Sequence, residues 1–383
     1  MKRFVLKLTF GALFFILFCL PLALQAQTRF LVVDVGSAVS GSTSSSGVAI
    51  NSLGNVVLSY DISHQSGLPA VWQNGVVTNL PVDGNRYATG IDRFGNVVGT
   101  FTGQSWGWVF RGGNYFIVPD QSWFSPNFFY ATSRVQGMND DGRFTGTISG
   151  LAPPGSYPAF TPATEAYSAF QLPTGEIQLQ RFGSYNGQST SGWGINELGD
   201  VVGAAGPATQ STPLLFRNGQ IEELPRNGGP LNRGEGINNA GYAVGFVSSP
   251  GQTVGFYAGS GAVWDVRVPG SPQLTLVGQL QGSNQSWLYD INDAGVAIGK
   301  ASLFNASVSL WSKPVIWTAA AGIQDLNALL DPASAGWEIT DVRAINATGQ
   351  IVGSARFNGS LRRAVRLDPQ QAPMIRTKQP SSR

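Results

Sequence analysis

The stretch Gly192-Trp193-Gly194-Ile195-Asn196-Glu197-Leu198-Gly199-Asp200-Val201-Val202-Gly203 decides the fold of this chain. It places an Asn three residues before a Gly, between two apolar segments. An Asn side chain can bond the backbone two residues further on, and Gly readily adopts the positive φ that closes a short loop. The stretch therefore predicts a β-hairpin, with Val201 and Val202 beginning the return strand.

The same pattern occurs seven times, at steps of 41, 47, 57, 42, 54 and 54 residues. The pairs of turn residue and Gly are Asn51 and Gly54, Asp92 and Gly95, Asn139 and Gly142, Asn196 and Gly199, Asn238 and Gly241, Asn292 and Gly295, and Asn346 and Gly349. A second Gly follows seven positions after the turn residue in six copies, and the first copy has Leu58 there. Such repetition indicates an array of units, each too small to bury its own apolar face.

A second motif lies between the hairpins and consists of a short apolar strand with an aromatic residue, a turn and a further strand. Its copies end in Trp72, Phe110, Phe170, Phe216, Trp264 and Trp317. Each repeat therefore contains four strands, and the aromatic residues are expected in the core between units. With 49 Gly and 22 Pro, and no long helical pattern except at Ile323 to Leu330, the chain is predicted to be all-β.

The two ends of the chain bear on the architecture. After the seventh hairpin, residues 364–367 supply a third strand, and no fourth precedes Asp368-Pro369. Residues 30–36 resemble the fourth strand of the other units. An N-terminal strand that completes the last unit closes a ring, so we predict a seven-bladed β-propeller of four-stranded blades. A β-solenoid or tandem sandwiches are the alternatives, although a solenoid would need polar capping repeats.

The N-terminal segment has the three parts of a secretory signal. Lys2, Arg3 and Lys7 precede an apolar run, and small Ala26 suits cleavage at the end of residues 1–26. The alternative, an uncleaved anchor helix, is disfavoured by Pro21 and by the short apolar run. We therefore predict a secreted protein, extracellular or periplasmic and free of the membrane after cleavage. It would consist of a single domain at 27–369 and a disordered tail at 370–383.

Charge and composition exclude several classes of partner. The full chain has 24 basic and 22 acidic residues, so removal of the signal leaves 21 against 22 and a net charge of −1. Nothing in this balance suggests binding of nucleic acid. The single cysteine, Cys19, lies in the signal, and His64 is the only histidine. We therefore expect no metal site and no cofactor, and we expect a monomer.

The repeat resembles that of the bacterial extracellular HAF-repeat proteins, named after a His-Ala-Phe trio. The resemblance rests on the Ile-Asn-x-x-Gly-x-Val-Val-Gly hairpins and the aromatic strands, and it extends over nearly all of 30–369. It implies an extracellular, propeller-like repeat protein and no particular activity. This chain departs from the family name, since no copy keeps the His. The corresponding places hold Leu68, Trp106, Ser168, Thr212, Ser260, Lys313 and Arg363.

Candidate binding residues occupy two places upstream of the turn that the repeat leaves free. Three residues before the turn residue stand Val48, Thr89, Gln136, Trp193, Glu235, Tyr289 and Arg343. Two residues further upstream stand Ser46, Tyr87, Arg134, Ser191, Arg233, Trp287 and Asp341. If the first hairpin strand is innermost, these places converge at one mouth of the channel, and aromatic and charged groups in a concavity are typical of a ligand site. Strand alternation also allows a location between blades.

The predicted ligand-binding residues are Tyr87, Arg134, Trp193, Arg233, Glu235, Trp287, Tyr289, Asp341 and Arg343. We interpret the chain as a non-catalytic binding propeller whose partner is an extracellular glycan or protein. One alternative is a polysaccharide hydrolase or lyase that uses Glu235 with Asp341 or Tyr289, because carboxylate pairs catalyse glycoside hydrolysis. A second alternative is a purely structural adhesion module.

Overall fold

The structure is a computed structural model that describes residues 28–81, 86–101, 106–118, 132–149, 164–207, 209–252, 258–305 and 308–370. The predicted signal peptide at 1–26 lies outside these ranges. So does the predicted tail at 370–383, apart from Gln370, which ends a strand.

Four sets of strands account for nearly all of the regular structure. The innermost set consists of β2(Ser44–Ile50), β6(Arg86–Ile91), β10(Thr132–Met138), β14(Thr190–Ile195), β18(Asn232–Ile237), β22(Gln285–Ile291) and β26(Trp337–Ile345). The second set consists of β3(Val56–Ile62), β7(Val97–Phe101), β11(Arg143–Ser149), β15(Val201–Ala205), β19(Tyr242–Ser248), β23(Ala297–Asn305) and β27(Ile351–Phe357).

The third set consists of β4(Gln65–Gln73), β8(Gly107–Arg111), β12(Thr164–Gln171), β16(Thr212–Arg217), β20(Gly259–Asp265), β24(Val308–Thr318) and β28(Arg363–Gln370). The outer set consists of β5(Val76–Asn79), β9(Asn114–Val118), β13(Ile177–Gly183), β17(Gln220–Glu223), β21(Gln273–Leu276), β25(Gly322–Asp325) and β1(Arg29–Asp34). Two short 3-10 helices, η2(Leu326–Leu329) and η3(Pro332–Ser334), follow β25.

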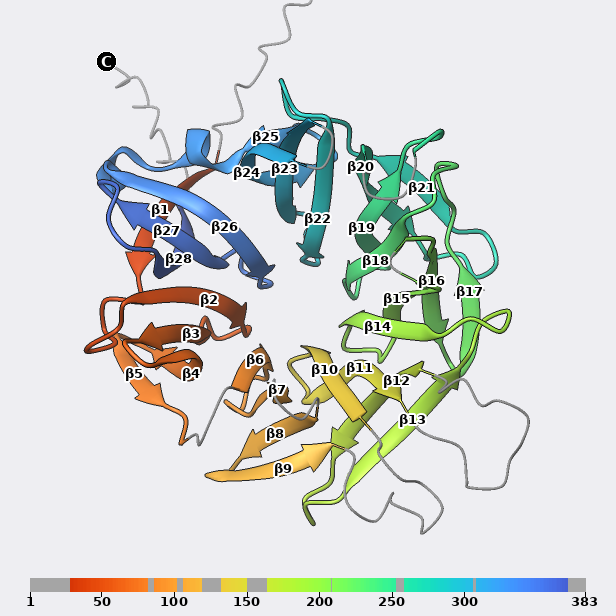
Figure 1. The fold of residues 1–383 in the computed structure, drawn as a ribbon, viewed down its shortest axis with the longest axis horizontal. Helices are drawn as coiled ribbons and strands as arrows, with labels where there is room; N and C mark the ends of the chain where they lie inside the picture. The colour runs from red at the N-terminus through yellow and green to blue at the C-terminus, as the bar shows by residue number, and fades with distance from the viewer. Residues whose placement is uncertain are drawn as a thin grey trace, which may run out of the picture.

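The strands form antiparallel sheets around a common centre, as in a β-propeller (Figure 1). Within the described ranges, five sheets have four strands, and an eight-stranded sheet contains both β18–β21 and β22–β25. One sheet has the order β1-β28-β27-β26, so the first described strand pairs with the last described strand. The prediction of an all-β chain built from four-stranded sheets is confirmed.

The hydrophobic core lies between neighbouring sheets. One cluster joins Val202 and Leu215, of the β14 sheet, to Ile237 and fully buried Trp264, which belong to the β18 strand group. Another joins Phe30 of β1 to Ile298 and Ile316 of β23 and β24. Each sheet therefore buries its faces against its neighbours, as the repeat predicted.

The hairpin turns hold together through their Asn or Asp residue. In the described structure, its Oδ1 accepts a hydrogen bond from the main-chain N–H four residues later in all seven turns. The predicted bond from the residue two positions later is present in the turns of Asn51, Asp92 and Asn346. The Gly three residues after the turn residue has a positive φ, which is 84° at Gly199.

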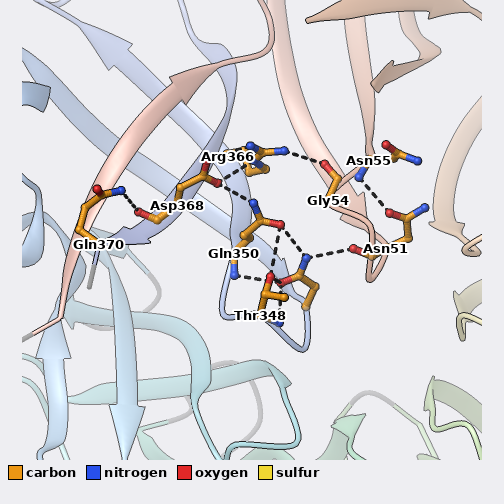
Figure 2. A network of polar contacts seen from close by, with 9 residues as sticks. Asn51, Gly54, Asn55, Thr348, Gln350, Arg366, Asp368 and Gln370 are labelled. Carbon is orange, nitrogen blue, oxygen red and sulfur yellow. Dashed lines mark hydrogen bonds and ion pairs between the residues drawn. The ribbon is translucent and has the colours of Figure 1, made fainter. Parts of the chain in front are cut away.

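The Asn side chains also connect one turn to the next. Each Asn Nδ2 donates to the main-chain carbonyl of the following turn residue, at 2.8 to 3.1 Å. The bond from Asn346 to Asn51 links the last turn to the first at 3.0 Å. Figure 2 shows this junction, where Gln350 and Arg366 from the C-terminal sheet face Asn51 and Gly54. The side chain of Asp92 has no N–H to donate, and this turn leaves the single gap among the described turns.

Candidate functional site

A β-bulge interrupts every innermost strand of the described structure three residues before its turn residue. The strand pairing skips one residue at each of these places. The skipped residues are Val48, Thr89, Gln136, Trp193, Glu235, Tyr289 and Arg343. A bulge redirects a side chain that strand alternation would point elsewhere. All seven residues therefore lie in the wall of the central channel, and Val48 packs against a core cluster as well.

The second Gly of the repeat makes room for the bulge. A Cβ on Gly203 would collide with the main-chain oxygen of Ser191, and a Cβ on Gly245 would collide with that of Arg233. The same clash recurs at Gly99, Gly146, Gly299 and Gly353. The small residue two positions before the turn residue has a similar cause, because a Cβ on Gly194 would lie 2.6 Å from the carbonyl oxygen of Glu235 on the next strand.

The channel is a cavity of about 400 Å³ that all of the innermost strands line. This volume lies within the usual range for small-molecule sites. Its wall is uneven in chemistry. The bulge residues of β2, β6 and β10 are uncharged Val48, Thr89 and Gln136, whereas those of the next strands are Trp193, Glu235, Tyr289 and Arg343. Aromatic and charged groups are therefore concentrated on one side.

Four predicted site residues form a single cluster on β14, β18 and β22. The Arg233 guanidinium lies over the rings of Trp193 and Trp287, 4.8 Å from each centroid. Trp287 also stacks on Phe246, with centroids 4.4 Å apart and planes at 10°. Trp287 is therefore in contact with both Arg233 and Phe246, while Trp193 lines the channel and is partly exposed. Such cation–π contacts hold Arg233 in place.

Glu235 is the polar centre of this cluster. Its Oε1 accepts hydrogen bonds from Arg233 Nε at 2.5 Å and from Trp287 Nε1 at 2.9 Å. Burial raises the pKa of the Glu235 carboxyl above its usual value, and Arg233 and Trp287 oppose that rise. Within the described residues no hydrogen bond reaches its Oε2, which leaves an acceptor at the channel wall.

A second group lies beside the first on β22, β23 and β26. Arg343 Nη2 pairs with Asp341 Oδ2 at 2.7 Å, and its guanidinium lies 5.9 Å from the Tyr289 ring centroid. Lys300 Nζ lies 5.8 Å from the same ring. Burial raises the pKa of Tyr289 and lowers the pKa of Lys300. Sequence reasoning missed Lys300 because it lies on the second strand, where only its register opposite Trp287 indicates its position.

Tyr87 and Arg134, the remaining predicted residues, lie on β6 and β10, away from this cluster. Tyr87 is 45% exposed and packs beside Gly67, and Arg134 is exposed. Neither is among the described residues that line the channel, and of the predicted residues only Trp193, Glu235, Tyr289 and Arg343 are. The structure thus brings together Trp193, Arg233, Glu235, Trp287, Tyr289, Asp341 and Arg343, and it separates Tyr87 and Arg134 from them.

The turn end of the channel is acidic. There the side chains that follow the turn residues connect neighbouring turns. Glu197 accepts from the Asp140 N–H at 2.9 Å, and Asp293 accepts from the Asn239 N–H at 2.7 Å. Asp140 in turn accepts from the Ser52 N–H. The described residues contain no cluster of His, Cys, Asp and Glu placed to hold a metal ion, and His64 is exposed.

No family model matches the chain, and no curated protein matches it. Among solved structures, the chain is similar to a puromycin-hydrolyzing peptidase of Mycobacterium tuberculosis, with a TM-score of 0.50 and 11% identity over 89% of this chain. This similarity concerns the fold alone, and the chain spans only 56% of that peptidase.

Two further solved structures match at lower TM-scores. They are the β-propeller domain of the trilobed protease from Pyrococcus furiosus (0.45, 9% identity, 90% of this chain and 98% of that one) and YCF48 from Cyanidioschyzon merolae (0.47, 10% identity, 89% and 98%). Among the described residues, no helix is both long and apolar enough to cross a membrane.

Proposed function

We propose that this chain is a secreted, non-catalytic seven-bladed β-propeller that binds an extracellular glycan at the mouth of its channel. The count of seven divides the eight-stranded sheet into two blades, because β20 and β22 meet in a single pair, Gly259 with Gln285. The same count assigns β1 to the last blade as its fourth strand, because β1 pairs with β28. The resemblance to HAF-repeat proteins and the signal-like residues 1–26 support the extracellular location.

One observation supports a glycan most strongly: the bulges direct Trp193, Glu235, Tyr289 and Arg343 into one side of the channel. Aromatic rings beside fixed carboxylate and guanidinium groups provide stacking surfaces and hydrogen bonds for a polyhydroxylated ligand. A cavity of about 400 Å³ accommodates a few sugar rings better than the surface of a protein. Glu235 Oε2 is available to accept from a sugar hydroxyl.

The experiment is binding of purified protein from Gln27 onward to a glycan array, beside Trp193→Ala and the control Trp311→Ala. Trp311 lies on β24 against Lys313, outside the channel wall. We expect Trp193→Ala to abolish binding while the protein remains folded, and Trp311→Ala to bind normally. If the wild type binds no glycan on the array, the glycan proposal is contradicted and an extracellular protein is favoured as the partner. Binding that survives Trp193→Ala would contradict this location of the site.

The raised pKa of Glu235 favours one second candidate, because general acids commonly have such pKa values. A polysaccharide hydrolase or lyase would use this carboxyl with Asp341 or Tyr289. Turnover of an array-positive glycan should then disappear in Glu235→Gln, while binding remains. Turnover that persists in Glu235→Gln would exclude this role for Glu235. Absence of any turnover by the wild type supports the binding protein.

A further inference from the structure

At the end of the channel opposite the turns, the positive and negative charges do not balance. Among the described residues of the two neighbouring groups there are three cations, Arg233, Lys300 and Arg343, and two carboxylates, Glu235 and Asp341. Arg233 is paired with Glu235, and Arg343 is paired with Asp341. Lys300 makes no hydrogen bond or ion pair within the described part of the chain. The combined group therefore has one positive charge in excess.

Lys300 lies next to Tyr289, a residue of the channel wall, although Lys300 itself is not among the described residues that line the cavity. It lies on β23, directly opposite Trp287 in the strand register, and its Nζ is near the ring of Tyr289, which lines the channel. Burial lowers the pKa of Lys300, and the charges of Arg343 and Arg233 lower it as well, whereas Asp341 and Glu235 raise it. A half-buried ammonium without a direct partner is destabilised, and a bound anion would relieve that cost.

We propose that the glycan recognised at this mouth is anionic and that Lys300 receives its carboxylate or sulfate group beside Tyr289. This inference rests on the proposed function and specifies its ligand. Arg233, which lies against Trp193 and Trp287, is paired with Glu235. Within the part of the chain that the structure describes, Lys300 is therefore the cation of the group that has no hydrogen bond or ion pair. A lysine ammonium acts as a point charge and accepts either anion without a planar match.

The opposite end of the channel strengthens the assignment. Asp140, Asp141, Glu197 and Asp293 line the turn end, and the cation among the described residues there is Arg93, which pairs with Asp141. Burial and the neighbouring carboxylates raise the pKa of Glu197. This end repels an anionic group. The two ends therefore differ in sign, and the electrostatic field favours placement of the anion at Lys300.

The test compares oligosaccharides by calorimetry at 50 mM and 500 mM salt. The anionic probes are oligogalacturonate, alginate, chondroitin sulfate and carrageenan oligomers, and the neutral probes are galactan, dextran and cello-oligomers. We expect at least one anionic probe to bind about tenfold more tightly than every neutral probe at low salt, with the preference reduced at high salt. Comparing the carboxylated probes, oligogalacturonate and alginate, with the sulfated carrageenan oligomers shows whether the site prefers a carboxylate or a sulfate group.

Three variants locate the effect. Lys300→Met should remove the anionic preference and leave the binding of neutral sugars unchanged, whereas Lys300→Arg should retain the preference. The control Lys313→Met removes an exposed lysine paired with Asp325 on the outer strands and should change nothing. If Lys300→Met fails to fold, Lys300→Gln and the salt dependence of the wild type replace it.

Each outcome is decisive. Equal binding of neutral and anionic probes, or binding of neutral probes alone, overturns the inference and leaves the glycan-binding proposal intact. An anionic preference that survives Lys300→Met at low salt overturns the role of Lys300. Binding of no probe overturns this inference together with the proposed glycan function.

Discussion

The side-chain amide of Asn346 donates to the main-chain carbonyl of Asn51, 3.0 Å away and 295 positions earlier in the sequence. This bond belongs to a series of identical contacts from turn to turn around the channel, which among the described turns is interrupted at Asp92. The turn Asn therefore has two tasks. Its oxygen shapes its own hairpin, and its nitrogen attaches that hairpin to the next sheet.

Asn346→Asp should destabilise the protein by about 2 kcal/mol, measured by urea unfolding. The substitution retains the oxygen that accepts from the Gln350 N–H, but it removes the donor to Asn51 and places a carboxylate in a buried turn. The exposed turn residue Asn358 provides the control, since Asn358→Asp leaves the ring of contacts intact. Equal unfolding midpoints for the two variants would contradict a structural role for this bond.

Asp92→Asn should stabilise the protein by about 1 kcal/mol at pH 7, because it supplies the donor that the described ring lacks. Burial raises the pKa of Asp92, so the wild type loses stability as pH rises through that pKa. The stabilisation by Asp92→Asn should therefore be larger at pH 7 than at pH 4, measured as a difference in melting temperature. An unchanged or lower melting temperature of Asp92→Asn at pH 7 would show that the new Nδ2 does not donate to the main-chain carbonyl of Asn139.

Asp290 should make the folded state less stable as pH rises from about 4 to 7. It stands where the other repeats have Gly or Ala, and its carboxylate accepts the N–H groups of Ile345 and Ile291 at 2.9 and 2.8 Å. Burial raises its pKa from 3.8 to about 6, so the folded state binds the proton more tightly than the unfolded state. The stability gained is fully present below pH 4 and is lost above pH 6.

Asp290→Ala should remove this component of the pH dependence. The loss in the wild type between pH 4 and 7, relative to the variant, should amount to at most about 3 kcal/mol. Urea unfolding at several pH values measures the difference directly, and other titrating groups cancel in the comparison. Parallel stability curves for the two proteins would rule out a raised pKa at Asp290.

Gly203→Ala should cost about 3 kcal/mol of folding free energy, because the new Cβ meets the rigid carbonyl of Ser191 at the bulge. Gly251→Ala is the comparison: this Gly has a φ of 74° and open space around it, so its substitution measures backbone strain alone, about 1 kcal/mol. Thermal unfolding separates the two costs. A loss at Gly203 no larger than at Gly251 would mean that the bulge tolerates a side chain.

Much of the candidate site was visible in the sequence, though its geometry was not. Trp193, Glu235, Tyr289 and Arg343 were identified because their place in the repeat varies freely. Regular alternation left open whether they faced the channel or the neighbouring sheet. The bulge resolves this question, and nothing in the residue pattern before Asn196 marks it. The feature of the sequence that accompanies the bulge is the second Gly. The structure explains this Gly, because a Cβ on Gly203 would collide with the main-chain oxygen of Ser191.

The sequence by itself determined the hairpin turns, the four strands of each unit and the all-β class, because these depend on contacts between residues close in the chain. The conformation of Gly199 and the bond from Asp200 to Asn196 are of this local kind. The tertiary structure alone decided that Asn346 binds Asn51, that Arg233 is held between Trp193 and Trp287, and that Lys300 stands beside Tyr289. The contacts of Asn346 and Arg233 join neighbouring strand groups, and their geometry arises only when these groups pack around a common channel. Lys300 and Tyr289 lie on the paired strands β23 and β22, where the bulge at Tyr289 decides how the two side chains meet.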